Sequence, residues 1–246
     1  MKRILIILLI IPLFIGCKKD VDFNQLQVKD NLYYDRDTGE KFTGSAKSYD
    51  KYEKIEKEGS FKDGRKNGVF KTHYIQGFVE SEENWKEGRK EGISKTFHSN
   101  GTLWKESNWV FGNENGVFKS FYPNEQLESE ENWKHGAKDG LSKSYYYDGQ
   151  LWIESNWESG YRHGSQKEYY ENGQLKHEFN WIENSIDGTF KEYYENGQLK
   201  EIGSTQGGIR KSYYENGQLK TESYWKEGKE ESSKSYSENG KLKTKK

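Results

Sequence analysis

The sequence has one cysteine, little apolar material and almost no net charge. Of its 246 residues, 31% are hydrophobic, and 39 lysine and arginine residues are balanced by 40 aspartate and glutamate residues. A single cysteine cannot form a disulfide within the chain, so other interactions must stabilise the fold. Nucleic acid is an unsuitable partner, because phosphate backbones require a positively charged surface. The low apolar fraction also argues against a globular enzyme with a thick core.

Aromatic residues, in contrast, are abundant. They make up 15% of the chain, with 18 tyrosines and 8 tryptophans. This content is too high for a disordered chain. A polar sequence that is rich in tyrosine and tryptophan indicates a thin fold with two exposed surfaces.

The N-terminus has the pattern of a removable leader. Lys2 and Arg3 precede an apolar run at residues 4–15, which is too short to span a bilayer and is typical of a signal peptide. The run ends just before Cys17. Residues 1–16 are therefore predicted to be a signal peptide. The polar residues 17–36 are predicted to form a tether and an entry cap.

The segment Phe14-Ile15-Gly16-Cys17 resembles the lipobox of bacterial lipoproteins, although Phe14 stands where leucine is usual. The resemblance implies that Cys17 becomes lipidated and anchors the chain to a membrane. Lys18 stands where an aspartate would signal retention in the inner membrane, so the resemblance points to the outer membrane of the cell envelope. The alternative is an ordinary leader with an accidental cysteine.

A repeated unit of about 24 residues occupies residues 37–246 in about nine copies. The stretch Tyr-Tyr-Glu-Asn-Gly-Gln-Leu-Lys at 169–176 returns at 193–200 and 213–220. Lysine, aromatic, leucine-type and tryptophan residues recur in columns. The lysine column consists of Lys47, Lys71, Lys95, Lys119, Lys143, Lys167, Lys191, Lys211 and Lys234. Such an array is stabilised chiefly by contacts between neighbouring units.

Each unit is predicted to be a β-hairpin that turns at Asn-Gly in a type I′ turn. A turn centred on Asn100-Gly101 places Lys95 opposite Glu106 and Trp109 opposite Gly92. The same register pairs Lys119 with Glu130, Lys143 with Glu154 and Lys167 with Glu178. The predicted fold is all-β, an elongated single-layer antiparallel sheet of repeated hairpins. A lysine–glutamate ladder covers one face, and the leucine, tryptophan and second tyrosine columns share the other.

The repeated units also resemble the MORN repeat variant of bacteria, often labelled the YwqK-type antitoxin family. The resemblance covers about residues 37–246 and rests on the stretch at 169–176 followed by Glu-x-x-Trp-Lys-x-Gly-x-x-x-Gly. It implies an elongated array of β-hairpins and carries over no catalytic residues. The antitoxin label implies a partner toxin, usually inside the cell, whereas the leader implies a place outside the cytoplasm.

No catalytic or metal site is predicted. The histidines have no ligand spacing, the carboxylates belong to the repeat, and the glycine-rich turns lack a strand–loop–helix setting. We therefore expect no enzyme activity and no cofactor. The histidines are His73, His98, His135, His163 and His177.

The aromatic columns are the candidate contact surface. Their rings could stack on a peptide or a sugar, but packing within a thin sheet also explains them. The favoured interpretation is a membrane-anchored scaffold that binds an unidentified protein in the cell envelope. The alternatives are an antitoxin or immunity-type protein that neutralises a toxin, and a protein that binds envelope glycan. The candidate contact residues are Trp85, Trp109, Trp133, Trp157, Tyr122, Tyr146 and Tyr170.

Overall fold

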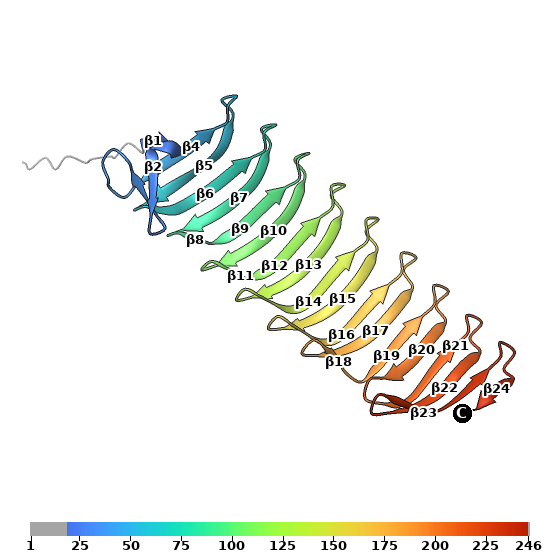
Figure 1. Ribbon diagram of the computed structural model, residues 1–246. Helices are drawn as coiled ribbons and strands as arrows, with labels where there is room; N and C mark the ends of the chain where they lie inside the picture. Colours follow the sequence, from blue (N-terminus) through green and yellow to red (C-terminus); the bar gives the residue numbers. More distant parts are fainter. Residues whose placement is uncertain (1–18, 246) are drawn as a thin grey trace, which may run out of the picture.

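The computed structural model describes residues 19–245 and shows one long, curved sheet (Figure 1). Within this range the strands from β4 to β24 follow in chain order, pair antiparallel and form nine hairpins, and there is no α-helix. The short strands β8, β11 and β18 pair with the same preceding strand as β9, β12 and β19, respectively. The predicted all-β, single-layer hairpin array is confirmed.

The first half of the sheet consists of β4 (Gly44–Tyr49), β5 (Ile55–Lys62), β6 (Arg65–His73), β7 (Val79–Lys86), β8 (Arg89–Lys90), β9 (Gly92–Phe97), β10 (Leu103–Val110), β11 (Asn113–Glu114), β12 (Gly116–Phe121) and β13 (Leu127–Lys134). The second half consists of β14 (Ala137–Tyr145), β15 (Leu151–Glu158), β16 (Tyr161–Tyr169), β17 (Leu175–Ile182), β18 (Ser185–Ile186), β19 (Thr189–Tyr193), β20 (Leu199–Ser204), β21 (Gly208–Tyr213), β22 (Leu219–Lys226), β23 (Lys229–Tyr236) and β24 (Leu242–Lys245).

The Asn-Gly turns differ from the predicted type I′ geometry. In the turn after β16, the N–H of Gly173 donates to the carbonyl of Tyr170 over 2.9 Å, and the N–H of Tyr170 donates to the carbonyl of Gln174 over 2.9 Å. The loop therefore has three residues, and Gly173 has a φ of 80° while Asn172 keeps a negative φ. Asn172 instead uses its side-chain oxygen, which accepts the N–H of Gln174. Three-residue loops of this kind need positive φ only at their last position.

Type I′ geometry occurs at the opposite edge of the sheet, where one hairpin leads into the next. Asp63 and Gly64 connect β5 to β6 with φ values of 50° and 76°. In Figure 1 the three-residue loops lie along the upper edge and the two-residue turns along the lower edge. Corresponding pairs with positive φ occupy positions 87–88, 111–112, 135–136, 159–160, 183–184 and 227–228.

The predicted register of the hairpins is confirmed. Lys95 faces Glu106, and Gly92 faces Trp109. The predicted register is correct although the predicted turn type is wrong, because two deviations from the predicted hairpin cancel. The three-residue loop shifts the pairing by one residue, and a β-bulge at Trp104, between the pairs formed by Leu103 and Lys105, shifts it back.

The lysine–glutamate ladder forms along one face. Lys119 lies 3.1 Å from Glu130, and the lysine and glutamate side chains are 40% and 39% exposed, so each such pair contributes little to stability. Lys167 faces Glu178 in the register, but the Glu178 carboxylate pairs with Lys191, at 3.0 Å. Ladder pairs also join Lys47 to Glu58, Lys71 to Glu82, Lys95 to Glu106, Lys143 to Glu154 and Lys211 to Glu222.

The leucine column lies on the ladder face, and its predicted place beside the tryptophans is wrong. Leu103 faces Phe97, which is two residues from Lys95 and therefore shares its face. The bulge at Trp104 separates the leucine from the tryptophan column, because it adds one residue between them. The sequence alone gave no sign of this bulge.

Residues 19–35, within the predicted tether and entry cap, are folded. β1 (Lys19–Asp22) pairs in parallel with β4 and covers the N-terminal edge of the sheet. The 3-10 helix η1 (Phe23–Gln25) and the hairpin of β2 (Leu26–Lys29) and β3 (Leu32–Asp35) follow. The buried apolar core combines Val21 and Leu26 of this segment with Phe42, Ala46, Phe61 and Phe70.

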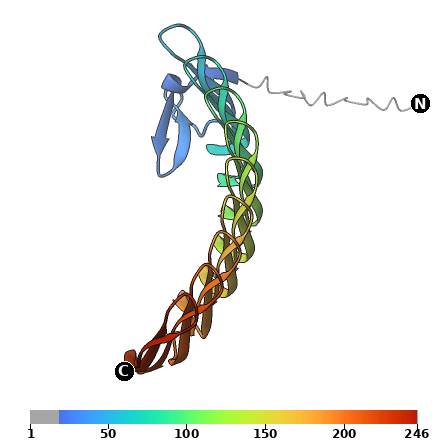
Figure 2. The same cartoon turned by 90° about the vertical axis from the view of Figure 1, so that its right-hand side faces the viewer.

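The sheet bends along its length, as Figure 2 shows. The β2–β3 hairpin lies on the inner side of the bend (Figure 2), and Tyr33 packs on Phe61, with ring centroids 4.4 Å apart. Phe61 occupies the tryptophan column position of its unit. We therefore call the face that carries the tryptophan column the concave face, and the face that carries the lysine–glutamate ladder the convex face.

Candidate binding surface

The second tyrosine column of the concave face connects each unit to the next. The hydroxyl of Tyr122 donates to the carbonyl of Tyr145, that of Tyr146 to Tyr169, and that of Tyr170 to Tyr193, over 2.7–2.8 Å. Burial raises the pKa of these three hydroxyls. Tyr74, Tyr194 and Tyr214 make the same contact, and His98 replaces tyrosine in one unit.

The tryptophan column runs parallel to the tyrosines, and its rings are half-buried. Most of the indole N–H groups donate to the side chain two residues earlier, as Trp109 does to Ser107 over 2.9 Å. Cations lie over the rings. The Nζ of Lys66 is 4.4 Å from the ring centroid of Trp85, and that of Lys90 is 4.6 Å from Trp109. Indole rings that carry a cation on one side contribute favourable cation–π energy to the sheet.

All seven aromatic residues proposed as contacts therefore lie on the concave face. None of the seven is fully exposed, and the three tyrosines use their hydroxyls within the sheet. The predicted signal peptide at residues 1–16 and the predicted lipidation site Cys17 lie outside the described residues.

Two tryptophans that the sequence analysis did not single out are more exposed. Trp104 and Trp152 are both 40% exposed and occupy bulge positions. They line an open groove of 420 Å³ on the concave face together with Tyr122, Phe118 and Glu131. Only the bulge brings these rings to this face, so the regular alternation of the strands could not reveal them.

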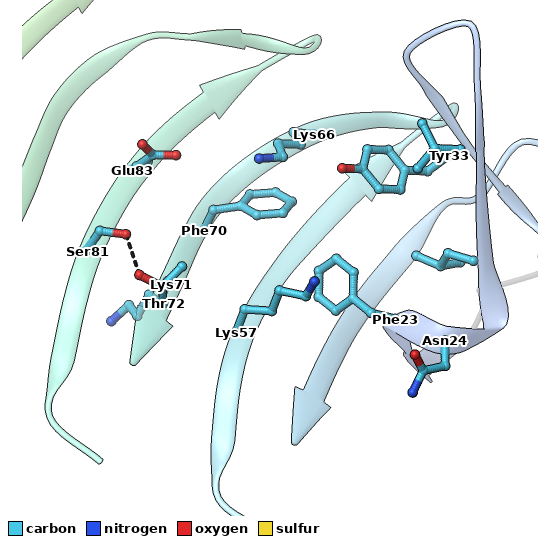
Figure 3. A pocket seen from close by; sticks show the side chains of 12 residues that line it. Phe23, Asn24, Tyr33, Lys57, Lys66, Phe70, Lys71, Thr72, Ser81 and Glu83 are labelled. Atoms are coloured by element: carbon cyan, nitrogen blue, oxygen red, sulfur yellow. Dashed lines mark hydrogen bonds between the residues drawn. The ribbon is translucent and has the colours of Figure 1, made fainter. Parts of the chain in front are cut away.

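A second groove, of 350 Å³, lies where the N-terminal cap meets the sheet (Figure 3). Phe23 and Tyr33 from the cap line it together with Phe70, Lys57 and Lys66 from the sheet. Burial lowers the pKa of Lys66. The groove is both aromatic and cationic, and the Nζ of Lys57 lies 4.6 Å from the ring centroid of Phe23.

A cluster of charges spans four strands, β16, β17, β19 and β20, further along the concave face. Glu168 accepts from Lys176 over 2.8 Å and lies 3.1 Å from Nδ1 of His177. The other ring nitrogen of His177 lies 3.6 Å from Glu192, which also accepts from Lys200 over 2.7 Å. Burial opposes ionisation of Glu168, but the hydrogen bonds from Lys176 and His177 keep its pKa below the usual value.

The described residues hold no group of three or more histidine, cysteine, aspartate or glutamate side chains that could bind a metal ion. Within residues 19–245, no helix has the length and apolar character needed to cross a bilayer.

The regular hairpins and their unit-to-unit contacts define a β-hairpin repeat protein. Six segments of the chain match the family model of the MORN repeat variant: residues 90–110, 114–135, 138–159, 162–183, 186–206 and 206–227. These segments cover just over half of the sequence, and the chain belongs to the MORN repeat variant family. No curated protein sequence matches the chain significantly.

Proposed function

We propose that the chain is a non-enzymatic lipoprotein that is anchored to the bacterial cell envelope through Cys17, at the outer membrane, and binds a protein partner on its concave face. Membership of the MORN repeat variant family supports a repeat protein that presents a binding surface. The apolar run at 4–15 followed by Cys17 supports the anchor.

The observation that carries the binding role is the aromatic groove on the concave face. Trp104 and Trp152 each leave 40% of their surface exposed, next to Tyr122 and Phe118. Exposed aromatic rings in a groove are typical of binding surfaces, because they bury a large area with few freely rotating bonds. Of the carboxylates that line the groove, Glu131 is already paired with Lys138, at 2.7 Å.

The test is a pull-down from crosslinked envelopes with four versions of the full chain: wild type, Cys17→Ser, Trp104→Ala with Trp152→Ala, and Tyr161→Ala. Tyr161 is 54% exposed and begins β16 directly after a two-residue turn, so it controls for the loss of an exposed aromatic ring. We expect Cys17→Ser to leave the membrane fraction, and the double tryptophan variant to stay there but lose its partner. A wild-type protein that stays soluble in the cytoplasm would contradict the anchor.

A second candidate function is that of an antitoxin or immunity-type protein. Its support is the likeness of the repeats to those that carry the YwqK-type antitoxin label. A toxin-like neighbouring gene and toxicity on deletion of this gene would favour this function, whereas viable deletion with envelope defects would favour the scaffold.

Envelope glycan is a third candidate ligand, because the exposed rings of Trp104 and Trp152 could stack on sugars. A glycan array probed with wild type and with the double tryptophan variant separates this possibility from protein binding.

A further inference from the structure

Trp181 departs from the hydrogen-bonding pattern of its column. The indole N–H groups of five other tryptophans donate to a serine or glutamate two residues earlier, as in Trp157 to Ser155 and Trp133 to Glu131. For Trp181 that position holds Phe179, and the buried Nε1 has no partner among the described residues. A buried donor without a partner is unfavourable, so its presence requires an explanation.

Gln166 provides an unpaired acceptor in the same unit. It is 8% exposed, and its buried Oε1 has no partner among the described residues. Gln166 lies on β16 two residues from Gly164, and Gly164 faces Trp181 across the strand pair. Gln166 and Trp181 are therefore diagonal neighbours on the concave face, one with an unpaired acceptor and the other with an unpaired donor. In the two preceding units the position of Gln166 holds Ser142 and Phe118, neither of which carries an amide.

Arg162 adds a cation without a carboxylate partner. Its guanidinium carbon lies 5.5 Å from the ring centroid of Trp157 and 5.0 Å from that of Trp181. Lysines at the corresponding position pair with a glutamate, Lys90 with Glu83 at 2.6 Å and Lys138 with Glu131 at 2.7 Å. In the unit of Arg162 that glutamate is replaced by Ser155, and no ion pair of Arg162 occurs within residues 19–245.

We propose that Arg162, Gln166 and Trp181 form a binding site for an acidic side chain of an extended peptide segment. The guanidinium presents paired N–H donors that match the two oxygens of a carboxylate. On binding, the side chains that cover the two buried atoms move aside, the Trp181 indole N–H adds a third donor, and the Gln166 oxygen accepts a backbone N–H of the same peptide. The proposal rests on the proposed function, because it names the chemistry that the protein partner brings to the concave face.

A peptide fits this site better than a glycan does. Sugars bind to tryptophan through an open ring face, but the guanidinium of Arg162 already lies over both Trp157 and Trp181. A simple anion also fits poorly, since the oxygen of Gln166 requires a hydrogen-bond donor. A glutamate or aspartate within an extended chain supplies both the anion and the N–H.

The experiment uses the full chain in mild detergent and two fluorescent decapeptide mixtures, random except for a fixed central glutamate or glutamine. Oligogalacturonate serves as the carboxylated sugar. Tryptophans are labelled as 5-fluorotryptophan, and the ¹⁹F signal of Trp181 is identified by its loss in Trp181→Phe.

The test variant is Ser155→Glu. It places a carboxylate beside Arg162 at the position where Glu131 pairs with Lys138. Ser107→Glu is the matched control, because Trp109 faces Glu114 and not a cation across the corresponding strand pair.

We expect the glutamate mixture to bind about tenfold or more tightly than the glutamine mixture and to shift the Trp181 signal, as expected for a charged hydrogen bond. Ser155→Glu and Arg162→Gln should lower the affinity by a similar factor with an unchanged circular dichroism spectrum, and Ser107→Glu should retain it. Equal binding of both mixtures, or a Trp181 signal that does not move, would overturn the site. A larger shift with oligogalacturonate would overturn the peptide as its occupant.

The test of the peptide site and the test of the proposed function can fail independently. If the glutamate mixture binds but Cys17→Ser remains in the membrane fraction, the lipid anchor is wrong and the site stands. If the anchored protein captures its partner equally well with Ser155→Glu, the site is wrong and the scaffold role stands.

Discussion

The hydroxyl of Tyr146 donates a hydrogen bond of 2.7 Å to the backbone carbonyl of Tyr169, which lies 23 residues later in the next unit. One side chain thus connects two successive hairpins in addition to the backbone ladder. Because the same contact recurs along the concave face, it fixes the spacing of the units and the position of the aromatic rings.

Removal of this hydroxyl should destabilise the array. We expect Tyr146→Phe to lower the free energy of unfolding by about 1–3 kcal/mol, because it leaves the carbonyl of Tyr169 without its partner. Urea denaturation measures the loss. Tyr147→Phe is the control, since Tyr147 is 58% exposed and should change stability by less than about 0.5 kcal/mol. Equal losses in the two variants would contradict the contact.

Glu125 should be replaceable with a gain in stability. It occupies the last position of its loop with a φ of 67°, where Gly101, Gly149 and Gly173 stand in other units. A left-handed backbone costs a residue with a side chain about 1–2 kcal/mol, so Glu125→Gly should stabilise the protein by about 1 kcal/mol. Glu171→Gly, in a loop position without positive φ, should not stabilise it, and a gain there would rule out the backbone explanation. Thermal unfolding of both variants gives the comparison.

Gly59 should tolerate no side chain. A Cβ atom at this position would lie 2.3 Å from Cε1 of Phe70, whose ring is buried under the N-terminal cap. We expect Gly59→Ala to cost about 1–3 kcal/mol through overpacking. In a Phe70→Leu background the same change should cost less, because the clashing ring is gone. A double-mutant cycle measures this coupling, and additive effects would contradict the clash.

The charge cluster at Glu168 should produce a pH-dependent contribution to stability in acid. Burial alone would raise the pKa of Glu168, but hydrogen bonds from Lys176 and His177 lower it below the usual value. A lowered pKa means that the ionised form stabilises the fold above the ordinary glutamate pKa of about 4.3, and that this stability is lost as the pH falls through the lower value.

The free-energy difference between wild type and Glu168→Gln should therefore be constant near neutral pH and shrink below about pH 4.3. Urea denaturation at a series of pH values measures it. In a Lys176→Met background the pH-dependent part should be smaller, since the main hydrogen-bond donor is missing. A difference that does not change between neutral and acid pH would contradict the role of the ionised carboxylate.

The hairpin register could be predicted from sequence because lysine and glutamate recur at fixed distances from each Asn-Gly pair. Few strand registers place Lys95 opposite Glu106. Because the same pattern recurs in the other units, it leaves one register. The loop geometry could not be predicted, since Asn100-Gly101 suits both a two-residue and a three-residue loop. The bulge at Trp104 has no sequence signature, and the error in the face of the leucine column follows from it.

The candidate site was only partly accessible from sequence. The columns identified Trp157 and Tyr146 as members of one face, because strand alternation determines faces. The unpaired groups of Gln166 and Trp181 could be identified only from the three-dimensional structure. These residues differ from the repeat in the hydrogen bonds they make, and residue type alone does not reveal this difference.

The link from Tyr146 to Tyr169 always points from one unit to the following one. Any copy can therefore accept the hydroxyl of the copy before it and offer its own to the copy after it. Duplication or loss of a whole unit in the gene leaves every remaining junction chemically complete. The length of the protein can thus change in evolution by unequal recombination between near-identical coding segments. Each such event lengthens or shortens the sheet by whole hairpins.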